Sequence, residues 1–379
     1  MTPVDRAEIV VDLDAIRHNV RTLRQRAAPA LMMTVVKADG YGHGIREAGR
    51  AARDAGADWL GVAVIEEALA LRAAGDTGRI LTWLAVPGED WRAPIAADVD
   101  VTAYTVAELE EIAAAAREVG TAARVQLKVD TGLSRGGSST ALWPELVAAA
   151  AKAEETGAVT VTGVWSHFAC SDEPEHPAND AQEAVFRDAL AVAGAGGLDP
   201  EVRHLANSAA ALLRPSSRFD LVRCGIASYG LSPAPAVATA AELGLVPAMR
   251  AQARVALVKR IPAGSGVSYG HTYVTDKDTT VVVVPAGYGD GVNRHASSTA
   301  PVHVAGARRT VSGRVCMDQF VVDIGDDEAH EGDLVELFGA GRDGRPTAQD
   351  WADACGTISY EIVTQIGGRM RRRHVEEGS

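Results

Sequence analysis

Eight short apolar runs, rich in β-branched residues, alternate with longer Ala-rich amphipathic runs between residues 31 and 224 of this 379-residue chain. Helical periodicity is clear in the intervening stretches Val106–Val119 and Ala181–Val192. Eight strand-then-helix units in about 200 residues fit a (β/α)8 barrel, whereas open doubly wound sheets usually stop at about six strands. The predicted strands are Leu31–Val36, Trp59–Ala63, Arg79–Leu84, Val99–Ala103, Arg124–Val129, Val161–Trp165, Val202–Leu205 and Leu221–Cys224.

The pattern changes after the eighth run. Leu231–Ala241, which is rich in Pro and Ala, breaks the alternation, and Gly, Asp and Pro then punctuate a series of strand-like runs. We therefore predict an α/β fold with a TIM barrel over residues 1–241, followed by a second, mainly β domain over residues 242–379. The Arg-rich end, residues 369–373, is interpreted as a solvated tail. The predicted strands of the second domain are Val255–Val258, Thr280–Val284, Val302–Val304, Phe320–Ile324 and Leu334–Phe338.

Composition excludes several classes of protein. Acidic residues outnumber basic ones by 50 to 37, and the net charge of −13 opposes a nucleic-acid partner. The longest apolar runs, such as Val281–Ala286, are far shorter than the ~20 residues of a membrane helix, and the N-terminus has no secretion signal pattern. The four cysteines are widely spaced without a C-x-x-C pair. We expect a cytoplasmic protein with no metal site and no nucleic-acid or membrane partner.

Lysine is scarce, with only five among the 37 basic residues, so each lysine position is informative. None belongs to a G-x-x-x-x-G-K-[ST] phosphate loop, and the glycines around Gly266 do not have the dinucleotide-binding spacing. Lys37 directly follows the first strand, which places its amine at the C-terminal mouth of the barrel. Apolar surroundings lower the pKa of a lysine from ~10.4, which frees the neutral amine for Schiff-base formation.

Polar residues follow the later strands at the same mouth. A phosphate site built by the loops after strands seven and eight recurs in this fold, and Ser208 and Gly225 occupy those loops. A Schiff-base lysine beside a phosphate site indicates pyridoxal 5′-phosphate. The polar or glycine positions at the strand ends are Asp130, Arg135, His167, Asn207, Ser208, Arg223 and Gly225.

Nearly the whole chain resembles the alanine racemase family of the fold-type III pyridoxal-phosphate enzymes. The barrel motifs are Val-Val-Lys37-Ala-Asp-Gly-Tyr41-Gly-His-Gly, Lys128-Val-Asp-Thr-Gly-Leu-Ser-Arg135, Ser-His167-Phe-Ala, Asn207-Ser208 and Arg223-Cys-Gly225-Ile226. The second-domain motifs are Val-Ser-Tyr269-Gly, Gly-Tyr288-Gly-Asp-Gly, Arg-Val-Cys316-Met317-Asp318 and Tyr360-Glu. The order of the motifs makes the resemblance specific.

The resemblance implies roles for the cofactor-binding residues. Lys37 holds the cofactor covalently, and Arg223 faces the pyridine nitrogen. Because arginine does not readily give up a proton, that nitrogen stays unprotonated and the cofactor is a weaker electron sink than with an Asp partner. The implied cofactor-binding set is completed by Tyr41, Ser208, Gly225, Ile226 and Tyr360 at the phosphate, together with His167 and Asn207.

The resemblance also implies a two-base racemisation. Lys37 serves the D side of the substrate Cα and Tyr269 the L side, with a chain Tyr269–His167–Arg223 assisting the tyrosine. A fixed positive charge at Arg223 keeps His167 neutral. Arg135, Met317 and Tyr288 are the implied substrate-binding residues.

Lys128 is left with two interpretations. In the family, the lysine at this position is often N-carboxylated and pairs with the arginine that matches Arg135. The alternative is a buried ion pair with Asp130 or another neighbour.

The family further implies a homodimer with shared active sites, in which the second domain of one chain reaches the barrel of its partner. The alternative is that this domain folds back on its own barrel. The expected reaction interconverts L-alanine and D-alanine and supplies D-alanine for peptidoglycan.

Other functions are retained as alternatives. Serine differs from alanine by one hydroxyl, which an apolar pocket rejects only about a hundredfold, so a serine or broader racemase is one alternative. A fold-type III decarboxylase and a non-catalytic cofactor carrier share parts of the layout. The segment Gly266-Val-Ser268-Tyr-Gly270 also fits the G-x-S-x-G pattern of serine hydrolases, with Asp290 and His295 following in order.

Overall fold

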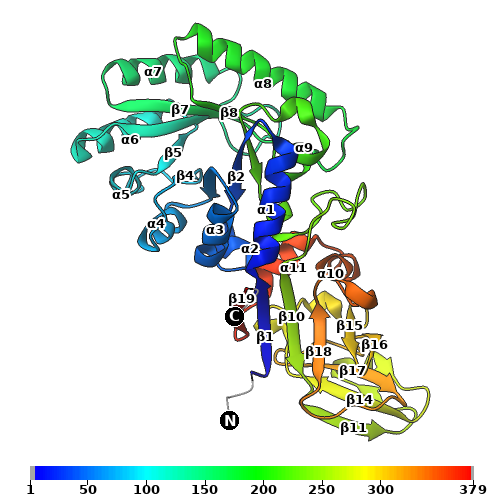
Figure 1. The fold of residues 1–379 in the computed structure, drawn as a ribbon. Coiled ribbons are helices and arrows are strands. Elements are labelled where there is room, and N and C mark those ends of the chain that lie inside the picture. The colour runs from blue at the N-terminus through cyan, green and yellow to red at the C-terminus, as the bar shows by residue number, and fades with distance from the viewer. Residues whose placement is uncertain (1–4, 377–379) are drawn as a thin grey trace.

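A computed structural model describes residues 5–376 of the chain. The molecule is elongated, with a barrel ringed by helices at one end and a mainly β domain at the other (Figure 1). The first strand lies in the β domain and the first helix, which follows it directly, lies beside the barrel, so together they cross from one part to the other. This architecture confirms the predicted fold class.

The barrel is an eight-stranded sheet in the order β8-β7-β6-β5-β4-β3-β2-β9, and all its pairings are parallel. Backbone hydrogen bonds from Asp220 to Arg203 (3.0 Å) and from Arg223 to Ala206 (2.9 Å) bring β9 against β8 and nearly close the barrel. Each predicted strand overlaps an observed one. The strands are β2 (Leu31–Val35), β3 (Trp59–Val62), β4 (Arg79–Thr82), β5 (Asp100–Ala103), β6 (Ala123–Lys128), β7 (Val159–Trp165), β8 (Val202–His204) and β9 (Leu221–Cys224).

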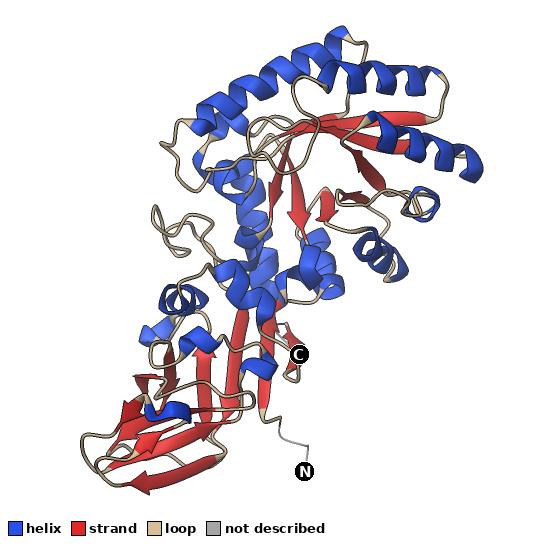
Figure 2. Ribbon diagram, turned by 180° about the vertical axis from the view of Figure 1, so that it is seen from behind, coloured by secondary structure: helices blue, strands red, loops and turns tan. Residues whose placement is uncertain are grey.

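Helices cover the outside of the barrel (Figure 2). Helix α6 (Val106–Val119) shows why these helices form. Thr105 caps its first turn in a reciprocal capping box with Glu108. Leu109, Ile112 and Ala116 form its buried face. The helices are α1 (Leu13–Ala27), α2 (Lys37–Tyr41), α3 (Ile45–Asp54), α4 (Ile65–Ala73), α5 (Arg92–Ala96), α6 (Val106–Val119), α7 (Trp143–Glu155), α8 (Ala178–Ala195) and α9 (Ser208–Leu213).

The second domain is built around a six-stranded sheet in the order β16-β15-β18-β10-β1-β19. A three-stranded sheet, β11-β14-β17, and the short hairpin β12-β13 complete it. The predicted strand Val255–Val258 is wrong in its bounds, because Val255 and Ala256 separate two strands. The strands are β10 (Met249–Arg254), β11 (Leu257–Ile261), β12 (Gly266–Val267), β13 (Tyr273–Val274), β14 (Thr279–Val284), β15 (Pro301–Val304), β16 (Ala307–Thr310), β17 (Phe320–Gly325) and β18 (Leu334–Phe338).

The first strand, β1 (Ala7–Asp12), lies outside the barrel that was expected to begin at residue 1. It pairs antiparallel with β10 and parallel with β19 (Arg371–Val375), so it belongs to the six-stranded sheet. Its alternating side chains Ile9 and Val11 are buried. The two ends of the chain are thus joined within the second domain.

The Arg-rich end is therefore not a solvated tail, and that prediction is wrong. Arg371 pairs with Asp5 at 3.2 Å, Arg372 with Asp39 at 2.7 Å, and Arg373 with Glu8 at 3.1 Å. Each charge is paired, and β19 gains a full register of backbone partners along β1. Two helices in this region were also missed, α10 (Ala348–Cys355) and α11 (Ser359–Gln365).

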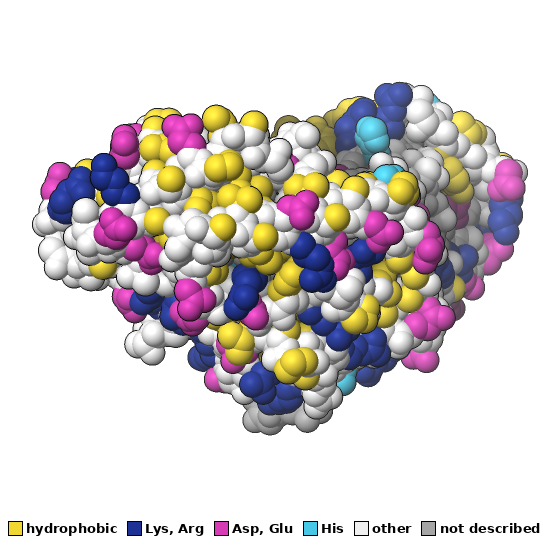
Figure 3. All heavy atoms as spheres, turned by 90° about the horizontal axis from the view of Figure 1, so that it is seen from above, with side chains coloured by type: hydrophobic (Ala, Val, Ile, Leu, Met, Phe, Trp, Pro, Cys, Tyr) yellow, Lys and Arg dark blue, Asp and Glu magenta, His cyan; other side chains and the backbone are white. Residues whose placement is uncertain are grey.

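The surface carries both signs of charge. Acidic and basic side chains are interspersed over the face seen from above (Figure 3). Within residues 5–376, no helix has the length and apolar character that crossing a membrane requires.

Candidate active site

A cavity of about 510 Å³ opens at the C-terminal mouth of the barrel. Four cationic side chains line it, and none of the lining residues is acidic, although the whole chain carries a net charge of −13. Most of the predicted site residues lie here together. The lining includes Lys37, Tyr41, Lys128, Arg135, His167, Asn207, Ser208, Arg223, Gly225, Ile226 and Tyr360, as well as Trp83, Tyr104 and Trp165, which were not predicted.

An unusual backbone turn follows Lys37. Ala38, Asp39, Gly40 and Tyr41 all have φ between 53° and 64°, so α2 is largely a left-handed turn. Non-glycine residues pay roughly 1 kcal/mol or more each for this conformation. The Asp39 carboxylate compensates by accepting from the amide of Ile45 at 2.9 Å, and Glu67 accepts from the amide of Ala38 at 2.6 Å. The turn brings the Lys37 and Tyr41 side chains to the same cavity.

Burial is the main cause of a lowered pKa at Lys37, and the nearby charge of Arg135 lowers it further. The Lys37 ammonium lies 5.8 Å from the centre of the Trp83 ring. A lysine whose neutral form is favoured in this way can act as a nucleophile or as a proton acceptor.

Ser208, Gly225, Tyr41 and Tyr360 line one part of the cavity, and the ring centres of the two tyrosines are 6.2 Å apart. The amide of Gly225 donates to the Ser208 hydroxyl at 2.9 Å, which ties the loops after β8 and β9 together. A Cβ on Gly225 would collide with the Tyr41 hydroxyl, so only glycine fits at this close approach. Three hydroxyls and a backbone turn thus meet at one end of the cavity, which suits a phosphate group.

Arg223 is buried in the lining of the cavity, where several hydrogen bonds hold its guanidinium. Its guanidinium donates to the carbonyls of Ser166 (2.7 Å) and Leu205 (3.1 Å). It also lies 3.1 Å from His167 Nδ1. Burial lowers the pKa of Arg223 to about 9, which leaves it charged at neutral pH. Burial and the Arg223 charge together lower the pKa of His167 well below its usual value, so the imidazole is neutral as predicted from the sequence.

Behind Arg223 lies a buried polar network that was not predicted. His204 Nδ1 lies 3.0 Å from Arg223 Nη1, and its Nε2 lies 2.7 Å from Gln126 Oε1. Gln126 Nε2 in turn donates to Asp100 at 3.3 Å. This arrangement sets the tautomer, because Nδ1 must accept from the guanidinium and Nε2 must donate to the amide oxygen. The sequence signal that could have revealed this network is the alternation of polar residues along β5, β6 and β8.

Lys128 makes no ion pair with Asp130. The Asp130 carboxylate accepts from the amides of Gly132, Leu133 and Ser134 and so shapes the following turn. The Lys128 ammonium instead lies over the rings of Trp165 (4.4 Å) and Tyr104 (5.2 Å). Burial, with Arg223 and Arg135 nearby, lowers the pKa of Lys128 to about 7.

Three predicted site residues lie apart from the cavity. Tyr269, Met317 and Tyr288 belong to the second domain, where their exposed fractions are 69%, 55% and 43%. None of the three lines the barrel cavity of its own chain. The predicted chain Tyr269–His167–Arg223 therefore has only its His167–Arg223 link within one chain.

The residues of the serine-hydrolase alternative are engaged elsewhere. The Ser268 hydroxyl donates to the carbonyl of Arg314 at 2.6 Å. Asp290 is paired with Arg6 at 2.7 Å and with Arg369 at 3.0 Å. Ser268 also leads into the short 3-10 turn Tyr269–His271, without the helix that a nucleophile elbow requires.

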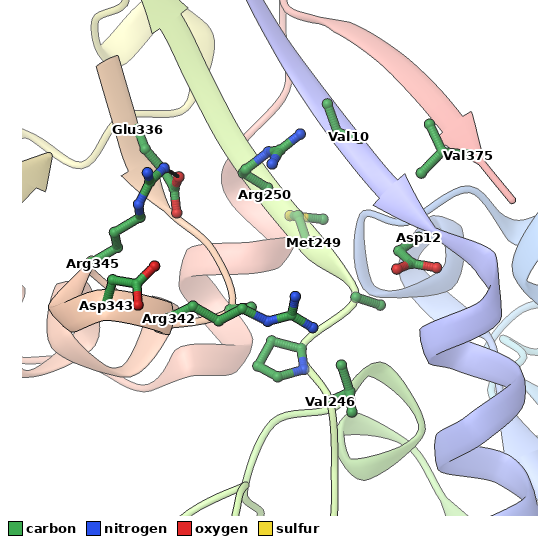
Figure 4. Close-up of a pocket in the computed structure, with 13 residues that line it drawn as sticks. Val10, Asp12, Val246, Met249, Arg250, Glu336, Arg342, Asp343, Arg345 and Val375 are labelled. Carbon is green, nitrogen blue, oxygen red and sulfur yellow. Dashed lines mark hydrogen bonds and ion pairs between the residues drawn. The ribbon is translucent and has the colours of Figure 1, made fainter. Parts of the chain in front are cut away.

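A second cavity, of about 300 Å³, lies in the second domain between β10, β18 and the end of β1 (Figure 4). Arg345 and Glu336 in its wall pair with each other at 3.0 Å. It contains none of the predicted site residues. Among residues 5–376, no cluster of His, Cys, Asp and Glu is arranged to hold a metal ion.

A barrel with a lysine-bearing, cationic mouth joined to a mainly β domain defines a fold-type III pyridoxal-phosphate enzyme. Comparison with known proteins identifies the family. Residues 11–233 match the model of the alanine racemase N-terminal domain, and residues 248–374 match that of the alanine racemase C-terminal domain. The chain belongs to the alanine racemase family.

Individual relatives agree. An alanine racemase from Salinispora arenicola is 57% identical over 361 residues, which cover 95% of this chain and 96% of the relative. The crystal structure of alanine racemase from D-cycloserine-producing Streptomyces lavendulae has a TM-score of 0.97 and 55% identity, covering 99% of this chain and 98% of that one. The Streptomyces coelicolor enzyme has a TM-score of 0.96, also at 55% identity and with 98% of both chains covered.

Pyridoxal 5′-phosphate is the cofactor of this family, and the cavity fits it. The hydroxyl-lined end and the Gly225 approach suit a phosphate, the Lys37 amine suits an aldehyde, and the surrounding cations suit an anionic molecule. Arg223 lines the same cavity.

Proposed function

We propose that this alanine racemase moves the Cα proton with two bases, Lys37 on the D side and Tyr269 on the L side. The observation that carries the proposal is the Lys37 amine: it lies at the mouth of the barrel with a lowered pKa, in a cavity that also holds Arg223 and His167. When bound, pyridoxal phosphate supplies an electron sink that acidifies the Cα–H bond of the amino acid. One base removes a proton from Cα and the other delivers a proton to the opposite face, so the reaction is balanced.

Arg223 tunes the reaction through its fixed charge. Nη1 and Nη2 of the planar guanidinium contact two carbonyls and two histidines, and the group remains charged at neutral pH. A permanently charged donor at the ring nitrogen does not protonate it. Arg223 therefore favours rapid removal and return of a proton over reactions that need a long-lived carbanion.

Tyr269 is proposed to act in the barrel cavity of a partner subunit. Its exposed position on the second domain leaves it free to enter the cavity of another chain. Neutral His167, whose Nδ1 accepts from Arg223, carries its proton on Nε2 and can donate a hydrogen bond to the Tyr269 oxygen. Exposure of Tyr288 and Met317 in the same domain supports the same arrangement. The expected assembly is a homodimer with two-fold symmetry, in which the second domain (predicted as residues 242–379) completes the site of the other chain's barrel.

The substrate carboxylate is proposed to bind Arg135, whose planar, two-pronged donor matches a carboxylate better than an ammonium does. Tyr288 and Met317 of the partner's second domain would leave room for little beyond a methyl group. Lys128, uncharged for about half of the time near pH 7, is proposed to be N-carboxylated, which would place an anion beside Arg135 and Arg223.

The product D-alanine is proposed to serve peptidoglycan synthesis in the cytoplasm. Four cysteines without a disulfide fit a reducing compartment. A deletion strain that grows only with added D-alanine, and activity in the soluble fraction of lysed cells, are the expected results. Growth without D-alanine would contradict the biosynthetic role.

The function is tested with the purified holoenzyme and L-alanine. Chiral chromatography should show conversion to an equal mixture of both enantiomers, and L-serine should react at least about tenfold less efficiently. Equal efficiency with serine would favour the broader racemase. Carbon dioxide release would favour a decarboxylase, and bound cofactor without turnover would favour a carrier.

A further inference from the structure

The turns that carry Tyr288 and Met317 are packed against each other. The amide of Tyr288 donates to the carbonyl of Cys316 (3.1 Å), and the amide of Gly289 donates to that of Met317 (2.8 Å). A Cβ on Gly287 would collide with the carbonyls of Cys316 and Met317. We call residues 287–291 and 316–318 the paired turns. Their close approach gives the Gly-Tyr-Gly-Asp-Gly motif a structural reason.

Arg369 bridges the paired turns through side chains. Its Nε and Nη2 donate to the two carboxylate oxygens of Asp290 at 3.0 and 3.1 Å, and its Nη1 donates to Asp318 at 2.6 Å. Asp290 follows Tyr288 by two residues, and Asp318 directly follows Met317. One guanidinium therefore joins the two turns immediately beside the side chains that they present.

The Asp290 end of the bridge is fixed by further interactions with the surrounding fold. Asp290 is fully buried, and Arg6 from the N-terminal segment donates to it at 2.7 Å. Its other oxygen accepts from the amide of Gly287 at 3.1 Å, and its carbonyl accepts from the amide of Gly367 at 3.0 Å. The Asp318 end is exposed, with a side chain that is 62% accessible. Arg369 thus extends from a buried, fixed carboxylate to the exposed carboxylate of the Met317 turn, and adds a side-chain bridge to the two backbone hydrogen bonds that join the paired turns.

We propose that Arg369 is a positioning residue for the racemase reaction, which fixes the Met317 turn against the Tyr288 turn and so sets the spacing of the two substrate-facing side chains. This inference rests on the proposed role of Tyr288 and Met317 at the substrate. A bidentate guanidinium suits the task because its planar fork fixes direction as well as distance. Loss of the bridge should weaken the binding of the substrate equally in the ground state and in the transition state. KM should therefore change more than kcat.

Steady-state kinetics of the holoenzyme test the proposal. Arg369→Met should raise KM for L-alanine about tenfold with kcat within about twofold, since small misplacements of positioning groups can cost up to ~100-fold. Arg369→Lys should be intermediate, because an ammonium can hold one carboxylate but not the fork. Arg371→Met is the matched control: it removes the 3.2 Å ion pair with Asp5, two residues along, and should leave KM unchanged. Unchanged KM in Arg369→Met would overturn the proposal.

A double-mutant cycle separates positioning from general stability. Asp318→Asn removes only the exposed end of the bridge, and should raise KM by a similar factor without changing the unfolding temperature or the absorption of the bound cofactor. The double variant should be no worse than the worse single variant. If Arg369→Met does not fold, Asp318→Asn alone decides, and an unchanged KM in that variant overturns the proposal.

Tyr288→Phe distinguishes the positioning role of Arg369 from the substrate role of the paired turns. If this variant raises KM while Arg369→Met does not, the positioning role is wrong and the substrate role of the turn stands. If neither variant affects KM, the placement of the paired turns at the substrate is itself wrong.

Discussion

At the scale of single residues, repulsion between like positive charges decides the chemistry of the cavity. Lys37, Lys128, Arg135 and Arg223 line a cavity that has no acidic lining residue, and burial lowers the pKa of the two lysines together with repulsion from neighbouring cations. The lysines can respond by losing a proton, whereas Arg223, whose pKa is about 9, remains charged at neutral pH. The same crowding of positive charge therefore lowers the pKa of both lysines and makes the cavity suited to an anion.

Lys37→Ala is expected to abolish racemisation in both directions and covalent retention of the cofactor, because one amine holds the cofactor and moves one proton. Borohydride reduction followed by peptide mapping should locate the label on Lys37 in the wild type. Lys152→Ala, which changes an exposed lysine of α7, is the control and should retain both properties. A reducible link that survived in Lys37→Ala would refute the assignment.

N-carboxylation of Lys128 should depend on pH in a defined direction. Only the neutral amine adds carbon dioxide, and the pKa of Lys128 is about 7. The carbamate should therefore form above about pH 7 and be lost as the pH falls below it. ¹³C-bicarbonate should give a carbamate NMR signal at pH 8 that disappears in Lys128→Arg. A wild-type enzyme with no signal at pH 8 would leave Lys128 as an unmodified amine.

Arg223→Glu should slow racemisation by about 10³-fold, the scale on which a preorganised charged donor contributes. A carboxylate would raise the pKa of the pyridine nitrogen and strengthen the electron sink. A new long-wavelength absorbance band and increased transamination are expected with L-alanine. Near-normal activity without a new band would contradict the proposed role.

At the scale of elements, the site depends on how the loops after β2, β8 and β9 meet. The left-handed turn after Lys37 brings Tyr41 against Gly225, where a Cβ would have to displace the Tyr41 hydroxyl. The Ser208–Gly225 hydrogen bond then fixes the phosphate end. Cofactor retention should therefore be sensitive to bulk at this junction.

Gly225→Ala should weaken cofactor retention at least about tenfold, or ~1.4 kcal/mol, because the new Cβ displaces the Tyr41 hydroxyl. Dialysis followed by cofactor titration measures the effect. Gly194→Ala in α8 is the control, since a Cβ there meets nothing within 4 Å. It should leave retention unchanged and alter stability by no more than ~1 kcal/mol. Equal retention in both variants would show that the close approach is unimportant.

The sequence alone predicted those elements whose hydrophobic pattern is local. Every barrel strand could be found because buried parallel strands read as short apolar runs between amphipathic helices. β1 and β19 could not, because each is defined by a partner hundreds of residues away, and the arginines of β19 suggested solvent. Cavity residues such as Lys37 and Ser208 were predicted from their positions at strand ends, and Tyr41, Ile226 and Tyr360 from the family resemblance, whereas Trp83, Tyr104 and Trp165 were missed. The His204–Gln126–Asp100 network was missed because its members lie inside the barrel, where spacing along the chain gives no pairing.

At the scale of the whole molecule, the two proposed bases lie in different domains of one elongated chain. Lys37 lies in the barrel, whereas Tyr269 is exposed on the domain at the opposite end. A two-fold dimer that places each second domain on the other barrel would bring them together twice. The central claim is therefore that every active site takes Lys37 from one chain and Tyr269 from its partner.

Subunit complementation tests this claim most directly. Inactive Lys37→Ala and Tyr269→Ala enzymes are mixed in equal amounts and re-equilibrated, and hybrid dimers are verified by distinct affinity tags. Each hybrid should contain one site with both intact residues and one with neither, so about a quarter of wild-type activity should return. If verified hybrids recover no activity above either parent, Tyr269 and Lys37 do not meet across the dimer, and the shared-site account is wrong.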